Sequence, residues 1–426
     1  MQSNNGSYPN NDSQQSFGPQ FQPGVQPQPG MPQQPGAQPQ PGMQPQQPEV
    51  RMQPGMQYQP GMPQQPGAQP QPGMQPGPYY GPYGMNGQMF VPVFDKKPHK
   101  KFFSRVGLSY FTFFIVTSVL QAVVALVARQ INPDIMDNYA AKIILALAPM
   151  YLVGAPIALL IMKKLPAGKP QGTKWNAGQI IGGFFVAYGL VYVSNIIGTT
   201  LGAVIEALVP GAQAATNDTQ ELVASGSILV NILAIAIIGP IVEELLFRKM
   251  LCDRLKVYGD GITMVVTGLV FAIFHGNLTQ GAYTFTLGMF FAYVYLKTGK
   301  LAITIAYHIG INFMGGVLPL IVMKDIDLSE YLHVVQSGDT DRILEFAENN
   351  AASLGYLALY IVILVGCALS GIIILIVTLA RKRVVLNPGR IMIPKGMRFS
   401  TIIVNVGMIL YIIMGIIIML LAMVPA

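Results

Sequence analysis

The chain of 426 residues is 51% hydrophobic and only 11% charged, with a mean hydropathy of +0.44. Because soluble domains carry about a quarter charged residues, this composition excludes an ordinary soluble protein and predicts a membrane protein. The formal net charge is +7, but the basic residues flank apolar runs instead of forming a basic domain. That placement favours membrane anchoring and argues against a nucleic-acid partner. Two cysteines without metal-ligand spacing exclude a disulfide framework.

The first 90 residues are of low complexity and consist mainly of Pro, Gln, Gly and Met. Such a segment has too little apolar surface to offset the entropy lost on ordering, so it is predicted to be a disordered tail. We interpret it as a solvated tether, with docking to an unidentified partner as the alternative. Residues 91–105 follow as a basic juxtamembrane segment, which we expect to contact the lipid bilayer at anionic headgroups.

Residues 106–426 alternate apolar stretches with short polar ones, which predicts an all-α, polytopic transmembrane helical bundle of about nine spans. The expected spans are Val106–Val127, Ala140–Met162, Gly178–Ile205, a fourth from Ile228 onward, Ile262–His275, Ala282–Leu296, Leu301–Val322, Ser353–Ala380 and Thr401–Met423. Basic clusters precede the first span and follow every second one, while residues 323–352 are expected to form an acidic loop. The positive-inside rule then places this multi-pass protein in the cell membrane, with the N-terminus in the cytoplasm and the C-terminus outside.

Two carboxylates and a guanidinium appear at the end of the fourth apolar run, in Glu243-Glu244-Leu-Leu-Phe-Arg248. The bilayer makes each of these charges costly. Glu244 and Arg248 are i,i+4 neighbours on a helix and are predicted to pair. Glu243 lies about 100° round the helix axis from Glu244 and has no partner within that pair. One acid is therefore neutralised in place, and the other remains available to a different group.

Two later apolar segments carry histidines. His275 ends the run Phe-Ala-Ile-Phe-His, and His308 and Asn312 are i,i+4 neighbours in the next motif. Taken singly, each of these polar residues is explained by snorkelling or by hydrogen bonding between packed helices. Their occurrence on three apolar segments, together with Glu243, predicts instead a polar pocket inside the bundle.

The motifs Glu-Glu-x-x-x-Arg, Phe-x-x-x-His and His-x-x-x-Asn, in this order on apolar helices, resemble the CPBP family of intramembrane proteases. That family includes the type II CAAX prenyl endopeptidases and the bacteriocin-processing or self-immunity Abi proteins. The resemblance covers a protease core at about residues 179–323. It implies an endopeptidase in which Glu243 and His275 activate a water while His308 and Asn312 stabilise the oxyanion. Glu244 and Arg248 then support the helix end.

The cofactor and the substrate remain open at this stage. Glu243, His275 and His308 are able to supply three ligands to a divalent metal such as zinc, whereas a glutamic-protease mechanism needs no metal and is the one we favour. The expected substrate is a membrane-associated peptide or protein, processed in CAAX-type or bacteriocin and propeptide maturation. The alternative function is that of a non-catalytic membrane scaffold or a bacteriocin self-immunity protein with the same fold.

Overall fold

The computed structural model describes residues 94–212 and 226–424. Within these ranges the regular structure is helical, and one isolated antiparallel bridge joins Gly259 to Pro388. The predicted all-α class is confirmed for this part of the chain. The tail predicted to be disordered lies outside the described residues.

Six helical stretches in the described ranges are long and apolar enough to cross a membrane. They are Lys96–Ile131 (α1), Tyr139–Met162 (α2, η2 and α3), Ala177–Leu208 (α4), Ile228–Tyr258 (α6 to η5), Leu301–Val322 (α11, η6 and α12) and Ala351–Ala380 (α15). A seventh is counted if the helices Lys395–Ile402 and Val406–Leu421, which meet at a bend of 69°, form one span. The structure therefore supports six or seven spans, fewer than the nine predicted.

The difference in span number lies in the fifth and sixth predicted spans. The fifth corresponds to α9 (Asp260–Phe274), which has 15 residues and is about 22 Å long, short of the roughly 30 Å hydrocarbon core. The sixth corresponds to α10 (Leu278–Thr298), which is long enough but not apolar enough. Its buried polar residues are Thr279, Gln280, Thr284 and Thr298.

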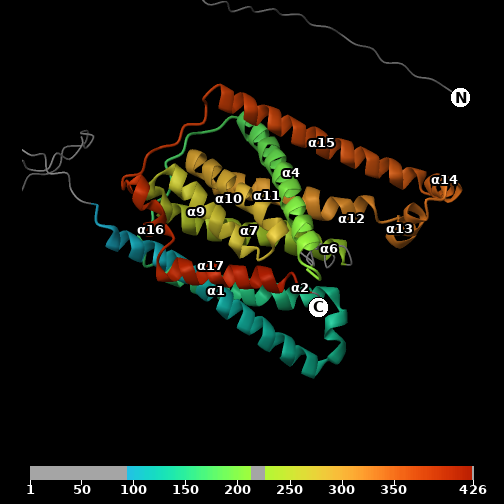
Figure 1. The fold of residues 1–426 in the computed structure, drawn as a ribbon, viewed down its shortest axis with the longest axis horizontal. Coiled ribbons are helices and arrows are strands. Elements are labelled where there is room, and N and C mark those ends of the chain that lie inside the picture. The colour runs from blue at the N-terminus through green and yellow to red at the C-terminus, as the bar shows by residue number, and fades with distance from the viewer. Residues whose placement is uncertain (1–93, 213–225, 425–426) are drawn as a thin grey trace, which may run out of the picture. The chain divides into compact units, whose positions relative to one another are not determined.

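The helices that carry the motifs are enclosed by other helices. Figure 1 shows α7 (Gly239–Glu244) and α9 to α11 in the middle of the bundle, with α15 on one side, α1 and α17 (Val406–Leu421) on the other, and α4 crossing them diagonally. Helix α10 contacts both α9 and α4, and α17 contacts α1 and α9. Close approach needs small residues, since a Cβ on Gly371 of α15 would lie 1.8 Å from the Phe185 carbonyl oxygen of α4.

Two aromatic clusters fill the core on either side of the motif helices. One joins α1, the segment after α7, α9 and α17, and includes Tyr110, Phe247, Phe271 and Tyr411. The other joins α4, α10 and α11 (Leu301–Asn312) around Tyr188, Phe291 and Tyr307. Burying such rings stabilises the bundle where its helices face one another, because each removes a large apolar area from contact with solvent or lipid headgroups.

The basic connections between helices meet at one end of the bundle. The Lys256 ammonium donates to the Lys169 carbonyl oxygen, and Thr173 N donates to the Lys297 carbonyl oxygen at 2.7 Å. Lys297 Nζ in turn lies 2.7 Å from Asp260 Oδ2. Connections that the positive-inside rule assigns to one side of the membrane thus lie together in space.

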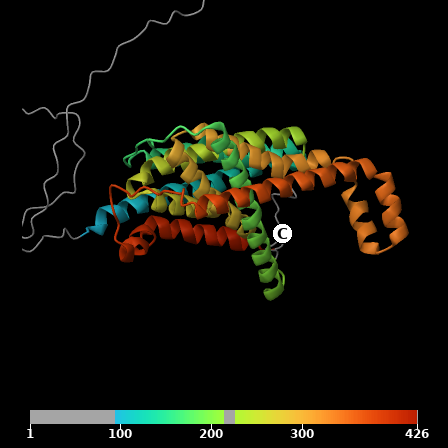
Figure 2. The ribbon, with the colours of Figure 1, turned by 90° about the horizontal axis from the view of Figure 1, so that it is seen from above.

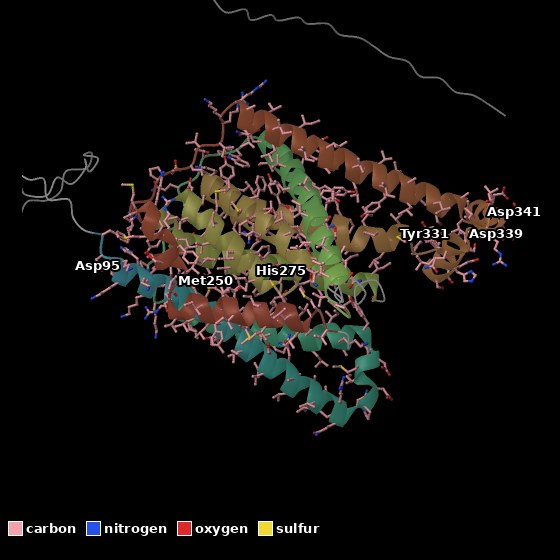
Figure 3. The ribbon with its side chains drawn as sticks, in the orientation of Figure 1. Asp95, Met250, His275, Tyr331, Asp339 and Asp341 are labelled. Atoms are coloured by element: carbon pink, nitrogen blue, oxygen red, sulfur yellow. The ribbon has the colours of Figure 1, made fainter. Side chains whose placement is uncertain are left out.

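The segment predicted to be an acidic loop folds instead into two helices, α13 (Leu328–Ser337) and α14 (Thr340–Asn349). Figure 2 shows this hairpin at one end of the bundle, and Figure 3 labels Tyr331, Asp339 and Asp341 on it. The Asp327 and Asp339 carboxylates cap the two helices by accepting backbone N–H bonds. The Ser329 hydroxyl and two backbone N–H groups hold the pKa of Asp327 below its usual range.

Deleting residues 1–90 is expected to leave folding and membrane insertion unchanged, because the sequence of this segment predicts little apolar burial. Size-exclusion chromatography of the truncated protein in detergent, beside the full chain, measures this. A loss of monodisperse, membrane-inserted protein would show that the tail is structurally required.

Candidate active site

The span that carries the two glutamates has an irregular backbone hydrogen-bond pattern. Two π-helical segments, η3 (Ile232–Ile238) and η4 (Leu245–Cys252), flank the short helix α7. Pro240 lies in the first turn of α7 and has no backbone N–H to donate, which favours a break in the regular hydrogen-bond pattern just before the glutamates. Widened π turns inside α-helices are frequent at functional sites.

The ion pair predicted from the i,i+4 spacing is present and completely buried. Arg248 Nε lies 3.1 Å from Glu244 Oε2, and both side chains are 0% exposed. The guanidinium carbon also lies 4.9 Å from the centre of the Phe271 ring and 5.1 Å from that of Phe291. An arginine held by a carboxylate and two aromatic faces is stabilised by both Coulomb and cation–π attraction. The pair therefore anchors α7 and η4 against α9 and α10.

His308 on α11 joins the two glutamates. Its Nδ1 lies 2.9 Å from Glu244 Oε1, and its Nε2 lies 3.8 Å from Glu243 Oε2. A carboxylate paired with Arg248 only accepts hydrogen bonds, so His308 Nδ1 carries the hydrogen of the shorter contact. The longer separation exceeds a direct hydrogen bond. The imidazole is thus fixed by Glu244 and presents its other nitrogen to Glu243.

Glu243 is held less closely than Glu244, because the ionic group that approaches its Oε2 is His308 Nε2 at 3.8 Å. Its side chain is 14% exposed, and its Oε2 atom is buried without a hydrogen bond from the described part of the chain. A buried carboxylate oxygen without a donor is costly. Residues kept in such a state need a functional explanation, and a water or substrate atom beside Glu243 supplies one.

His275 lies at the end of α9, where the chain turns. Gly276 adopts a φ of +61°, a left-handed conformation that ends the helix without the strain a side chain would bring. His275 Nδ1 lies 2.9 Å from the Phe271 carbonyl oxygen, which only accepts, so Nδ1 is the donor and Nε2 is left available. Figure 3 shows His275 inside the bundle, between Asp95 at the start of α1 and the α13–α14 hairpin.

Asn312, the last residue of α11, contacts the span that carries the two glutamates. Its amide nitrogen donates to the Ile235 carbonyl oxygen of η3 at 3.1 Å. The four side chains predicted to form the site thus lie on three helical segments of the bundle, and one of the two amide hydrogens of Asn312 is used in a hydrogen bond between two of these segments.

The described residues do not offer a metal site. Nowhere in the two described ranges do three His, Cys, Asp or Glu side chains come together in a group able to hold a metal ion. The candidate zinc ligands Glu243, His275 and His308 are all described, and they do not form such a group. No step of the mechanism below is derived through a metal.

Two tyrosines that the sequence analysis did not single out also face Glu243. Tyr151 of the second span and Tyr283 of α10 both lie close enough to interact electrostatically with its carboxylate. The chain has 19 tyrosines, and nothing in the local sequence distinguishes these two. Only the packing of distant helices identifies them.

Comparison with known families agrees with this arrangement. A family model described as type II CAAX prenyl endopeptidase Rce1-like matches residues 225–314. The matched range contains every residue of the three motifs. This part of the chain is similar to that family. The resemblance to the CPBP proteases is thereby confirmed, and similarity to this protease family implies a peptidase.

Two curated bacterial proteins are similar to this chain. The membrane-embedded CAAX protease MroQ of Staphylococcus aureus is 25% identical over 168 residues, which cover 37% of this chain and 67% of MroQ. The putative membrane peptidase YdiL of Bacillus subtilis is 25% identical over 166 residues, which cover 37% of this chain and 64% of YdiL. The similarity thus spans about two thirds of each relative. No solved structure matches the chain.

Proposed function

We propose that this protein is an intramembrane endopeptidase that hydrolyses a peptide bond in a membrane-associated substrate. The observation that carries the proposal is the asymmetry of the two glutamates. Glu244 pairs with Arg248 at 3.1 Å and accepts a hydrogen bond from His308 Nδ1 at 2.9 Å, whereas among the described residues the nearest charged group to Glu243 Oε2 is His308 Nε2 at 3.8 Å. A base that is free, partly buried and surrounded by oriented imidazoles is what activation of water requires.

In the proposed reaction Glu243 accepts a proton from the attacking water as the water oxygen bonds to the peptide carbonyl carbon. His275 helps to hold this water by accepting its second hydrogen at Nε2, the nitrogen left available by the Phe271 bond. When the carbon–nitrogen bond breaks, Glu243 returns its proton to the leaving amine. The products are a carboxylate and a protonated amine, because the amine takes up the proton that the new carboxylic acid releases. Glu243 thus carries out both of its acid–base steps as one residue.

The negative charge that develops on the carbonyl oxygen needs donors. Asn312 supplies its second amide hydrogen, because the first donates to the Ile235 carbonyl oxygen. His308 donates from Nε2 in its imidazolium form, in which both ring nitrogens carry hydrogen, with Nδ1 held by Glu244. Donors fixed before the reaction are effective because they need no reorganisation when the charge forms.

The substrate class follows from the family and its named relatives. A C-terminal CAAX-type peptide, prenylated or not, is the first candidate, since MroQ is named a CAAX protease. Peptides released in bacteriocin or propeptide maturation are the second. We further propose that the basic end of the bundle, with Lys169, Lys256 and Lys297, faces the cytoplasm, in agreement with the positive-inside rule.

Comparative peptidomics tests the proposal. Membranes from cells that produce the wild-type protein and from cells that produce Glu243→Gln at equal level are compared for new peptide termini. At least one processed terminus is expected in the wild-type membranes alone. If no terminus differs, the protein is a membrane scaffold or a self-immunity protein, and the peptidase proposal fails.

A further inference from the structure

Besides the motif residues, two tyrosines on separate helices lie within electrostatic range of Glu243. Tyr151 lies in the π-helical segment η2 (Pro149–Gly154), and Tyr283 lies in α10. Both interact electrostatically with Glu243. Tyr151 precedes the range 225–314 that matches the family model. The motifs of that range therefore do not account for it.

Local geometry brings Tyr151 against the glutamate helix. A Cβ atom placed on Gly239 would come within 3.3 Å of Tyr151 Oη. Gly239 is one helical turn before Glu243, so the absence of a side chain there leaves room for the phenol beside α7. Tyr151 also lies in a π-helical segment, η2. Segments of the same kind, η3 and η4, flank the helix that carries Glu243.

The two hydroxyls are not used by the fold. Neither Tyr151 nor Tyr283 forms a hydrogen bond with any other residue of the described ranges. Other tyrosines of the bundle behave differently. Tyr110 donates to the Leu246 carbonyl oxygen at 3.0 Å, and Tyr411 donates to the Val270 carbonyl oxygen at 2.7 Å.

A peptide that enters a membrane-embedded site brings backbone N–H and C=O groups that have lost their water. In apolar surroundings, each backbone group that stays without a hydrogen-bond partner makes binding of the peptide less favourable. A phenol both donates and accepts, so it pairs with either kind of backbone group. Unused hydroxyls beside the catalytic base meet this need regardless of the substrate's side chains.

We propose that the Tyr151 and Tyr283 hydroxyls bind the main chain of the peptide substrate and hold its scissile bond against Glu243. They are positioning residues and take no part in proton transfer. The proposal rests on the proposed function and adds to it the groups that fix the backbone of the substrate.

The probe is an internally quenched synthetic peptide that spans a terminus found only in wild-type membranes. Its hydrolysis is followed with purified protein in detergent to give kcat and KM. The variants are Tyr151→Phe and Tyr283→Phe, each of which removes one oxygen atom. Tyr411→Phe is the matched control, because its hydroxyl is buried and hydrogen-bonded in the fold but lies in a different cluster.

We expect each active-site variant to raise KM by about tenfold, the usual effect of losing one hydrogen bond to a buried group, with kcat changed less than about twofold. Their melting temperatures are expected to equal that of the wild type, since no bond of the fold is lost. Tyr411→Phe is expected to show the opposite pattern, with a lower melting temperature and unchanged KM and kcat.

Other outcomes separate this inference from the proposed function. If Glu243→Gln leaves all termini unchanged, the proposed function and the inference fall together. If the probe is cleaved in a Glu243-dependent manner and both tyrosine variants keep the wild-type KM, only the inference fails. A drop in kcat at constant KM would also overturn it, because the hydroxyls would then act on the chemical step.

Discussion

Replacing Glu243 by glutamine is expected to lower kcat by about 10²- to 10⁴-fold, the usual contribution of a positioned base, while the protein keeps its stability. Glutamine retains the shape of the side chain but does not accept the proton of water. The buried Oε2 atom of Glu243 has no hydrogen bond to lose within the described residues. Turnover of the quenched peptide and thermal unfolding in detergent measure the two effects on one sample.

The substitution Glu244→Gln is expected to lower the stability of the protein more than its activity. Glu244→Gln leaves the Arg248 guanidinium buried without its counter-charge, and breaking a buried pair in this way costs about 3–5 kcal/mol. In the wild type His308 Nδ1 lies 2.9 Å from Glu244 Oε1, and the side-chain oxygen of a glutamine is still able to accept this hydrogen bond. Activity of the remaining folded protein is therefore expected to fall much less than in Glu243→Gln.

A second i,i+4 pair on the same span provides the control. Lys249 Nζ lies 2.7 Å from Asp253 Oδ2, but the Lys249 side chain is 49% exposed. Exposed pairs contribute about 0–1 kcal/mol, so Lys249→Gln is expected to change neither stability nor turnover appreciably. Equal losses of activity in Glu243→Gln and Glu244→Gln, with stability unchanged in both, would contradict the different roles assigned to the two glutamates.

The features that the sequence predicted correctly are local ones. The Glu244–Arg248 pair follows from a spacing of four residues, because one helical turn brings the two side chains together. The all-α class follows from the lengths of the apolar runs. The bond from His308 to Glu244 links positions 64 residues apart, and no local pattern specifies which nitrogen faces which carboxylate.

Some predictions were wrong although the sequence contained the correct signal, because another feature of the same segment was given more weight. Asp327 and Asp339 are capping residues just before α13 and α14, yet the acidic composition of the segment suggested a loop. Polar residues of α10 were read as part of an apolar span. The π-helical segments η3 and η4 have no recognised sequence signature, so the contact of Asn312 with the Ile235 carbonyl oxygen was not predictable.

Asn312 is expected to be the second most sensitive position. Asn312→Ala is expected to lower kcat by about 10²- to 10³-fold with little change in KM, the usual cost of removing one oxyanion donor. The variant also loses the bond to Ile235, worth about 1 kcal/mol of stability. Asn405→Ala serves as the control, because Asn405 caps α17 by accepting from Met408 N at 3.0 Å. It is expected to lose stability and keep kcat.

The same purified protein distinguishes water activation by Glu243 alone from metal-assisted hydrolysis. Because the described His, Cys, Asp and Glu residues form no three-membered group with metal-binding geometry, we expect far less than one equivalent of bound metal and full activity after prolonged chelation. A zinc site built from Glu243, His275 and His308 would instead bind metal stoichiometrically and lose it when one ligand is replaced. Elemental analysis of the wild type and of His275→Ala measures this. Stoichiometric zinc that disappears together with activity on chelation would overturn the glutamic-protease mechanism.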